Sequence, residues 1–170
     1  DFVLPIGKAR IHKTGKDVTM VSFGIGMTYT VKAAAELATL GIDAEIIDLR
    51  TLRPIDYDTI IASVMKTGRA VVIAEGYPQC SIGDHVANQI MQRAFDYLDA
   101  PVITIAGKDV PMPYATTLEK LALPNVGEVV PNDDKPRLIQ VLRSLSAFTT
   151  TAERFGDGDG ACGARIEPGM

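Results

Sequence analysis

The feature that most constrains the fold is a regular alternation, from Asp17 to about Pro124, of short β-branched runs with longer stretches of helical spacing. The short runs predict strands over 18–23, 43–49, 70–74 and 102–105. The longer stretches predict helices over 28–40, 56–68 and 81–97, with a short one near 116–120. Strands that alternate with helices are typical of a parallel sheet covered by helices. We therefore predict an α/β fold with a mostly parallel sheet.

Local signals place the helix ends and faces. Gly41 and Gly68 stand where helices end in the left-handed conformation, and Asp56 can cap the helix that follows it. The first helix is expected to face the sheet with Val31, Ala34, Ala35 and Ala38. The helix over 81–97 carries two apolar rows, formed by Ile82, Val86, Ile90 and Tyr97 and by Met91, Phe95 and Leu98. Two apolar rows indicate burial between layers or between subunits, so we expect assembly.

Charge and cysteine content exclude several classes of partner and site. The 17 Lys and Arg against 21 Asp and Glu give a net charge of −4, with no basic cluster longer than a pair, so nucleic acid and anionic membranes are not expected partners. The longest apolar runs, such as 70–74, are far below the ~20 residues of a spanning helix. Cys80 and Cys162 support neither a disulfide framework nor a zinc site.

The chain is expected to divide into four segments. Residues 1–16, which open on Asp1, are interpreted as a polar lead-in from a missing N-terminal domain, and 17–130 as the α/β domain. Residues 131–148 are predicted to form one more helix. Five of the last 15 residues are Gly, so 149–170 is predicted to be a disordered tail.

The first strand ends in a glycine turn that could hold a dinucleotide. Gly24 and Gly26 precede a helix, and Asp48 follows 22 residues after Gly26. However, Tyr29 stands where the third glycine of that motif belongs, so a plain turn is the favoured interpretation. Cys80, at a helix start, is interpreted as a small filler rather than a nucleophile.

Three charged side chains follow the carboxyl ends of predicted strands. Arg50, Arg53 and Glu75 fall at the edge where open α/β sheets bind ligands. The alternative is a structural ion pair that ties the loops together. Asp99, before Ala100 and Pro101, has the pattern of a turn residue.

Five segments together resemble the C-terminal, transketolase-C-like domain of pyruvate dehydrogenase beta subunits. They are Leu4-Pro5-Ile6-Gly7-Lys8-Ala9, the run from Asp48 to Asp56, Glu75-Gly76-Tyr77-Pro78-Gln79, the run from Ala94 to Pro101, and the run from Gly107 to Ala115. The resemblance covers about residues 2–130, and it implies a three-layer fold with helices on both faces of the sheet. From about residue 131 the sequence departs from the family.

The resemblance also implies a role within a larger enzyme. That family converts pyruvate to an acetyl group on lipoamide with thiamine diphosphate and magnesium, in an assembly of two alpha and two beta subunits. The cofactor lies outside the matching domain, so this chain alone is expected to bind none and to be inactive. The implied location is a bacterial cytoplasm or the mitochondrial matrix.

The implied partners are the alpha subunit, a second beta subunit and the binding domain of the dihydrolipoyl acetyltransferase. Asp99 matches the carboxylate that docks this binding domain, and Arg50, Arg53, Glu75 and Tyr77 are predicted to lie at a subunit interface or in the crevice. The alternatives are a branched-chain 2-oxoacid dehydrogenase beta subunit, the C-terminal part of transketolase, or a stand-alone nucleotide-binding module using Gly24, Gly26 and Asp48.

Overall fold

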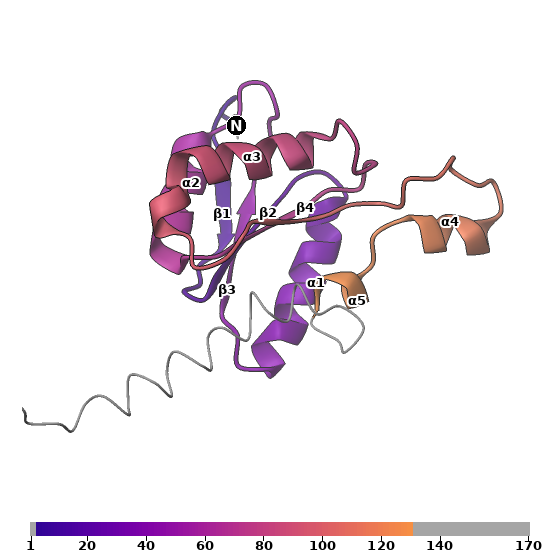
Figure 1. The fold of residues 1–170 in the computed structure, drawn as a ribbon, viewed down its shortest axis with the longest axis horizontal. Coiled ribbons are helices and arrows are strands. Elements are labelled where there is room, and N and C mark those ends of the chain that lie inside the picture. Colours follow the sequence, from indigo (N-terminus) through magenta and orange to yellow (C-terminus); the bar gives the residue numbers. More distant parts are fainter. Residues whose placement is uncertain (1–2, 131–170) are drawn as a thin grey trace, which may run out of the picture.

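A single five-stranded sheet with helices on both faces forms the body of the protein in a computed structural model that describes residues 3–130 (Figure 1). The strand order is β1-β3-β2-β4-β5, in which β1 is antiparallel to β3 and the other neighbours are parallel. The strands are β1 (Arg10–Lys13), β2 (Val18–Ser22), β3 (Ala44–Asp48), β4 (Ala70–Ile73) and β5 (Ile103–Ile105). The helices are α1 (Gly26–Thr39), α2 (Tyr57–Thr67), α3 (Ile82–Ala94), α4 (Thr116–Ala122) and α5 (Val126–Val129), with a 3₁₀ turn, η1, at Phe95–Tyr97. The predicted α/β class is confirmed.

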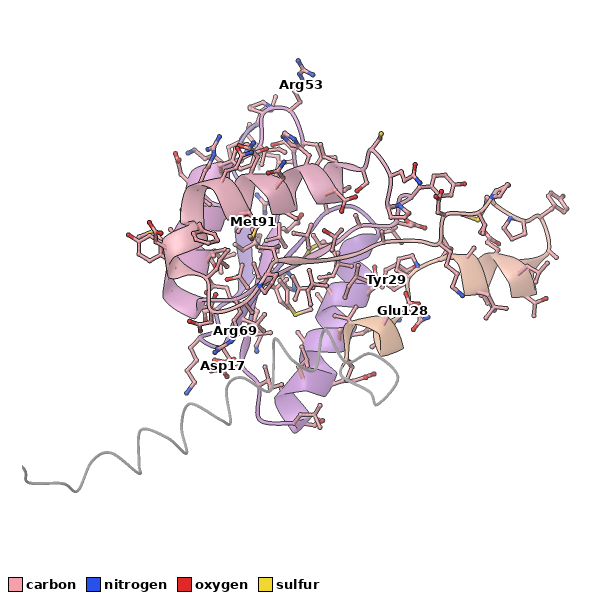
Figure 2. All side chains as sticks on the ribbon, in the orientation of Figure 1. Asp17, Tyr29, Arg53, Arg69, Met91 and Glu128 are labelled. Carbon is pink, nitrogen blue, oxygen red and sulfur yellow. The ribbon has the colours of Figure 1, made fainter. Side chains whose placement is uncertain are left out.

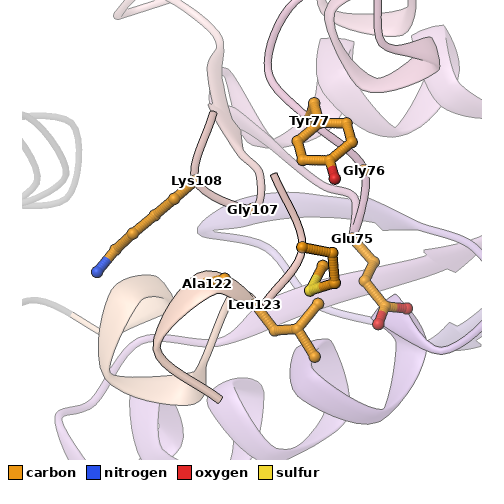
Figure 3. A pocket seen from close by; sticks show the side chains of 8 residues that line it. Glu75, Gly76, Tyr77, Gly107, Lys108, Ala122 and Leu123 are labelled. Carbon is orange, nitrogen blue, oxygen red and sulfur yellow. The ribbon is translucent and has the colours of Figure 1, made fainter. Parts of the chain in front are cut away.

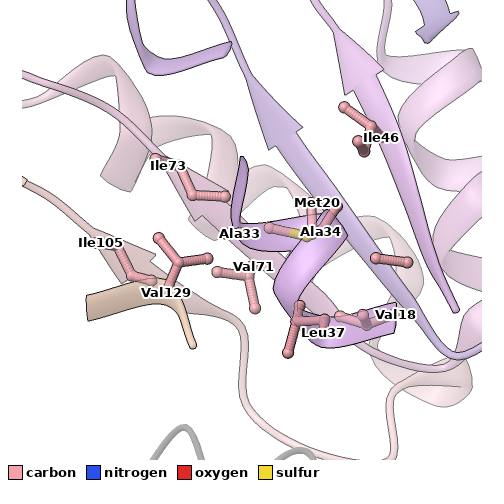
Figure 4. Close-up of a cluster of buried hydrophobic side chains, with 11 residues drawn as sticks. Val18, Met20, Ala33, Ala34, Leu37, Ile46, Val71, Ile73, Ile105 and Val129 are labelled. Carbon is pink, nitrogen blue, oxygen red and sulfur yellow. The ribbon is translucent and has the colours of Figure 1, made fainter. Parts of the chain in front are cut away.

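The sheet buries apolar side chains on both faces because its central strands are covered by a helix layer on each side. Successive residues of a strand point to opposite faces, so Val71 packs in the cluster beneath α1 and Val72 in the cluster beneath α2 and α3. The cluster beneath α1 also takes in Val129 of the short helix α5 (Figure 4). This near-continuous apolar pattern is what strands buried on both faces require.

The predicted capping residues of α1 and α2 are confirmed, whereas α3 ends at Ala94, earlier than predicted. The Asp56 side chain accepts a hydrogen bond from Thr59 N and caps α2, while Gly68 ends that helix with φ 68°. Gly41 follows α1 with φ 80°. Ser81 caps α3 by accepting from Asp84 N.

The predicted sheet-facing side of α1 is wrong except at Ala34. The buried residues of α1 are Gly26, Thr30, Ala33, Ala34 and Leu37, whereas Val31, Ala35 and Ala38 are exposed. The buried face of α1 is rotated because Gly26 starts the helix against the backbone of Ile73. The residues that follow Gly26 at helical spacing, Thr30, Ala33 and Leu37, therefore face the sheet.

The end of the predicted α3 helix is the 3₁₀ turn η1, which contains Phe95 and Tyr97. Tyr97 is 49% exposed and Phe95 is 67% exposed, so burial of this end between subunits stays a prediction.

Strand β1 was not predicted, because its residues fall in the segment interpreted as a polar lead-in. It pairs with the outer edge of β3, with Arg10 opposite Asp48 and Ile11 opposite Ile47. Just before it, Gly7 N donates to Thr51 Oγ1 and Ala9 N donates to the Asp56 carboxylate. The lead-in is therefore fixed to the connector before α2. The helix predicted for 131–148 and the tail predicted for 149–170 lie outside the described residues.

Candidate functional site

An open pocket of about 370 Å³ lies beyond the carboxyl ends of β4 and β5 (Figure 3). Two backbone hydrogen bonds close its rim, from Gly107 N to Gly76 O and from Lys108 N to Ala122 O. A side chain at Gly107 would place its Cβ 2.9 Å from Glu75 O, so glycine allows the two loops to meet. The lining residues are Glu75, Gly76, Tyr77, Gly107, Lys108, Met112, Ala122 and Leu123.

The pocket brings together only part of the predicted crevice set. Glu75 and Tyr77 line it, but Arg50 and Arg53 do not. Arg53 lies at the exposed end of the connector and points away from the body (Figure 2). Within residues 3–130, no ion pair joins either arginine to Glu75. Lys108 also extends away from Glu75 (Figure 3), so the pocket holds a single carboxylate among mainly apolar walls.

The glycine turn after β2 has a packing explanation. A Cβ on Gly26 would lie 2.5 Å from Ser22 Oγ and 3.2 Å from Ile73 O, which means that the helix can start there only without a side chain. Asp48 Oδ1 accepts a hydrogen bond from the backbone of Arg50, which has φ 59°. These residues therefore shape two loops, in agreement with the plain turn favoured by the sequence.

Asp99 lies at the opposite end of β4, beside the residue that precedes this strand. Its Oδ2 is 2.9 Å from Nη2 of Arg69, and its backbone N donates to Gly68 O at 2.8 Å. The Asp99 side chain is 54% exposed, whereas that of Arg69 is 8% exposed. Asp99 is thus a turn residue held by an ion pair within its own chain.

Arg69, the ion-pair partner of Asp99, was not predicted from the sequence. Its Nε is buried and has no hydrogen-bond partner in the described part of the chain. The sequence around Arg69, a C-capping glycine followed by a buried strand, does not indicate its ion pair with Asp99, because the two residues are 30 positions apart. Only the folded arrangement reveals that a buried cation lies next to the predicted docking carboxylate.

A buried carboxylate, Glu45, lies between β3 and α2. It accepts hydrogen bonds from Ser63 Oγ, Lys66 Nζ and Gly15 N, and Ser63 also shares a hydrogen bond with Thr19. Burial acts to raise the pKa of Glu45, but the hydrogen bonds and the Lys66 charge outweigh it and hold the pKa below its ordinary value of 4.5. This network joins a helix to the sheet and does not line the pocket beyond β4 and β5.

Other chemically capable side chains are dispersed. Cys80 is an exposed free thiol with φ 56°, and His85 Nε2 is hydrogen-bonded to Tyr57 Oη rather than to the thiol. Across the described ranges, no three His, Cys, Asp or Glu side chains come together in a way that could hold a metal ion. A search of the same residues finds no helix with the length and apolarity that crossing a membrane requires.

The sequence matches the family model for the transketolase C-terminal domain over residues 7–129. The chain therefore belongs to the transketolase C-terminal domain family. Within that family, it is 74% identical over 130 residues to a pyruvate dehydrogenase E1 component subunit beta of Rhizobium meliloti, a match that covers 76% of this chain and 28% of the relative. It is 52% identical over 129 residues to subunit beta-1, mitochondrial, of Arabidopsis thaliana, covering 76% of this chain and 36% of that protein.

A solved structure supports the same fold. A split-gene transketolase, described as an inactive β4 tetramer, matches 86% of this chain and 44% of its own with a TM-score of 0.65 and 27% identity. The chain spans about a third of the length of the curated relatives named above. These comparisons confirm the resemblance inferred from the five sequence segments.

Proposed function

We propose that the chain is the C-terminal domain of the beta subunit of a thiamine-diphosphate-dependent pyruvate dehydrogenase component, and that it serves assembly rather than bond chemistry. The observation that carries this proposal is the 74% identity to a pyruvate dehydrogenase E1 beta subunit over 130 residues. The complete enzyme would decarboxylate pyruvate and transfer the acetyl group to lipoamide. A bacterial cytoplasm or the mitochondrial matrix is the compartment that the bacterial and mitochondrial relatives favour.

The described residues do not fit a thiamine diphosphate site. The cofactor's diphosphate is bound through a magnesium ion, and residues 3–130 bring together no three His, Cys, Asp or Glu side chains that could hold one. The pocket beyond β4 contributes one carboxylate, Glu75, and a lysine that extends away from it. No reaction step is therefore assigned to this chain.

The proposed partners are an alpha subunit, a second beta subunit and the binding domain of the dihydrolipoyl acetyltransferase. Apolar side chains left exposed by the described residues support subunit contacts, notably Phe95 on η1 and Tyr114 in the segment that extends toward α4 (Figure 1). The matched transketolase is a tetramer of beta chains, which supports association between copies. Asp99, half-exposed at a turn, is the proposed contact for the acetyltransferase domain.

Co-purification tests this proposal. The chain is mixed separately with a pyruvate dehydrogenase alpha subunit, with an intact beta subunit and with the acetyltransferase binding domain, each at micromolar concentration. We expect retention of these partners and no turnover of pyruvate by the chain alone with thiamine diphosphate and magnesium. A branched-chain 2-oxoacid dehydrogenase alpha subunit is the control for substrate class. Failure to bind any pyruvate dehydrogenase partner would contradict the proposal.

A further inference from the structure

We propose that Arg69 limits how strongly Asp99 binds a basic partner, so that docking is set by competition between a cation of this chain and a cation of the partner. This inference rests on the docking role proposed for Asp99. The proposal adds Arg69 as a residue that adjusts the affinity of Asp99 for a partner, although Arg69 itself is too buried to contact that partner. Two features of the turn support the competition, and a third makes it testable.

The first feature is that the carboxylate is fixed before any partner arrives. Asp99 N is hydrogen-bonded to Gly68 O at 2.8 Å, and Oδ2 lies 2.9 Å from Arg69 Nη2. A Cβ on Gly68 would lie 2.8 Å from the same Oδ2, so the carboxylate rests directly against the glycine. Removal of Arg69 therefore leaves the backbone hydrogen bond that positions Asp99 in place.

The second feature is the unequal exposure of the pair. Asp99 is 54% exposed and accessible to a partner, whereas Arg69 is 8% exposed and its Nε is buried. An incoming cation would meet the carboxylate while being repelled by the guanidinium behind it. Because the two charges sum to zero, the attraction that remains is weaker than that of a lone carboxylate.

The third feature is that Arg69 can be replaced with less damage than Asp99. An Arg69→Met change keeps the long apolar stem, removes the unpartnered Nε, and leaves a half-exposed carboxylate that water can solvate. An Asp99→Asn change instead leaves a buried guanidinium without its counter-ion. Arg69→Met is thus the variant expected to stay folded with its docking carboxylate intact.

The test is a double-mutant cycle on the 170-residue chain. The parent, Arg69→Met, Asp99→Asn and the double variant are each titrated by calorimetry with the isolated binding domain of a dihydrolipoyl acetyltransferase, at low and high NaCl concentration. Circular dichroism confirms that each variant is folded. We expect Arg69→Met to bind about fivefold more tightly than the parent at low salt, with a steeper loss of affinity as salt is added. Asp99→Asn should bind more weakly, and the double variant should stay weaker than the parent.

Each contrary result has its own meaning. If Asp99→Asn binds weakly but Arg69→Met binds no more tightly than the parent, the competition is overturned while the docking role of Asp99 stands. If Asp99→Asn binds as the parent does, the docking role fails, and the competition fails with it. Recovery of parental affinity in the double variant would also overturn the proposal, because net charge alone would then explain the binding.

Discussion

At the residue scale, two buried carboxylates show how hydrogen bonds keep a charge inside the fold. Asp56 accepts from Ala9 N and from both the backbone and the hydroxyl of Thr59. Burial acts to raise the pKa of Asp56, yet these bonds and the nearby Lys8 charge hold it below its ordinary value of 3.8. Glu45 behaves in the same way, so both carboxylates favour the folded state in their ionised form.

Glu45 predicts how stability changes in acid. Its pKa is lower in the folded chain than in the unfolded chain, so the unfolded state binds more protons over the interval between the two values. The stabilisation of the fold by ionised Glu45 is present above about pH 4.5 and is lost as the pH falls through the pKa of Glu45 in the folded chain. At neutral pH, Glu45→Gln should lower the free energy of unfolding by about 1–3 kcal/mol.

Urea unfolding followed by circular dichroism between neutral and acidic pH measures this effect. The gap between the parent and Glu45→Gln should narrow below about pH 4.5, because protonation removes the same charge in the parent. Glu36→Gln, on the exposed side of α1, is the matched control and should follow the parental profile. A gap that stays constant from neutral to acidic pH would rule out the role given to the Glu45 network.

The sequence identified Asp99 and Glu75 as separate candidates, but it could not show their surroundings. Resemblance to a family located Asp99, while the pairing with Arg69 depends on the α2–β4 turn meeting the turn before β5. Arg53 is a different case. Its position after a strand suggested a crevice or a subunit interface, and because the connector that contains it leads away from the pocket, only the interface stays a prediction. Position beyond a strand end does not fix the direction of a side chain.

At the scale of elements, helix termination was the most predictable feature, because it depends on one or two residues. A glycine after an apolar period marked the ends of α1 and α2 in both the sequence and the structure. Strand β1 carried no such signal. Its residues are Arg10–Lys13, mostly exposed and half of them basic, and they become a strand only because β3 offers an unpaired edge.

The two terminating glycines give a matched pair of variants. Gly41 and Gly68 have φ values of 80° and 68°, but a Cβ meets nothing within 4 Å at Gly41 and meets the Asp99 carboxylate at Gly68. Gly41→Ala should lower the free energy of unfolding by about 1 kcal/mol through backbone strain alone. Gly68→Ala should cost more, about 2–3 kcal/mol, because it also displaces the ion pair. Equal losses in urea titrations would show that the carboxylate does not rest against Gly68.

At the scale of the whole molecule, one sheet separates two apolar clusters that share its strands. Val71 belongs to the cluster beneath α1, and its neighbour Val72 to the cluster beneath α2 and α3. A backbone shift of these strands that disrupts one cluster therefore also disrupts the packing of the other. This arrangement predicts cooperative unfolding rather than separate loss of the two layers.

Val71→Ala and Val72→Ala test this cooperativity. Each should lower the free energy of unfolding by about 1–3 kcal/mol through lost burial and the cavity that remains. In each variant, urea transitions followed by circular dichroism and by tyrosine fluorescence should coincide. Val31→Ala, at a position 38% exposed, is the control and should cost about 0.5 kcal/mol or less. Two resolved transitions in either core variant would contradict a single cooperative unit.

The position of β4 has a consequence for simultaneous binding. This strand is four residues long, so about 13 Å of backbone separates the Arg69–Asp99 turn from the loop at Glu75. Two ligands of modest size, one at each end, would share no contact residue and would not exclude each other. Their affinities should then be independent, so a small molecule in the pocket would leave a small cation bound at the turn undisturbed.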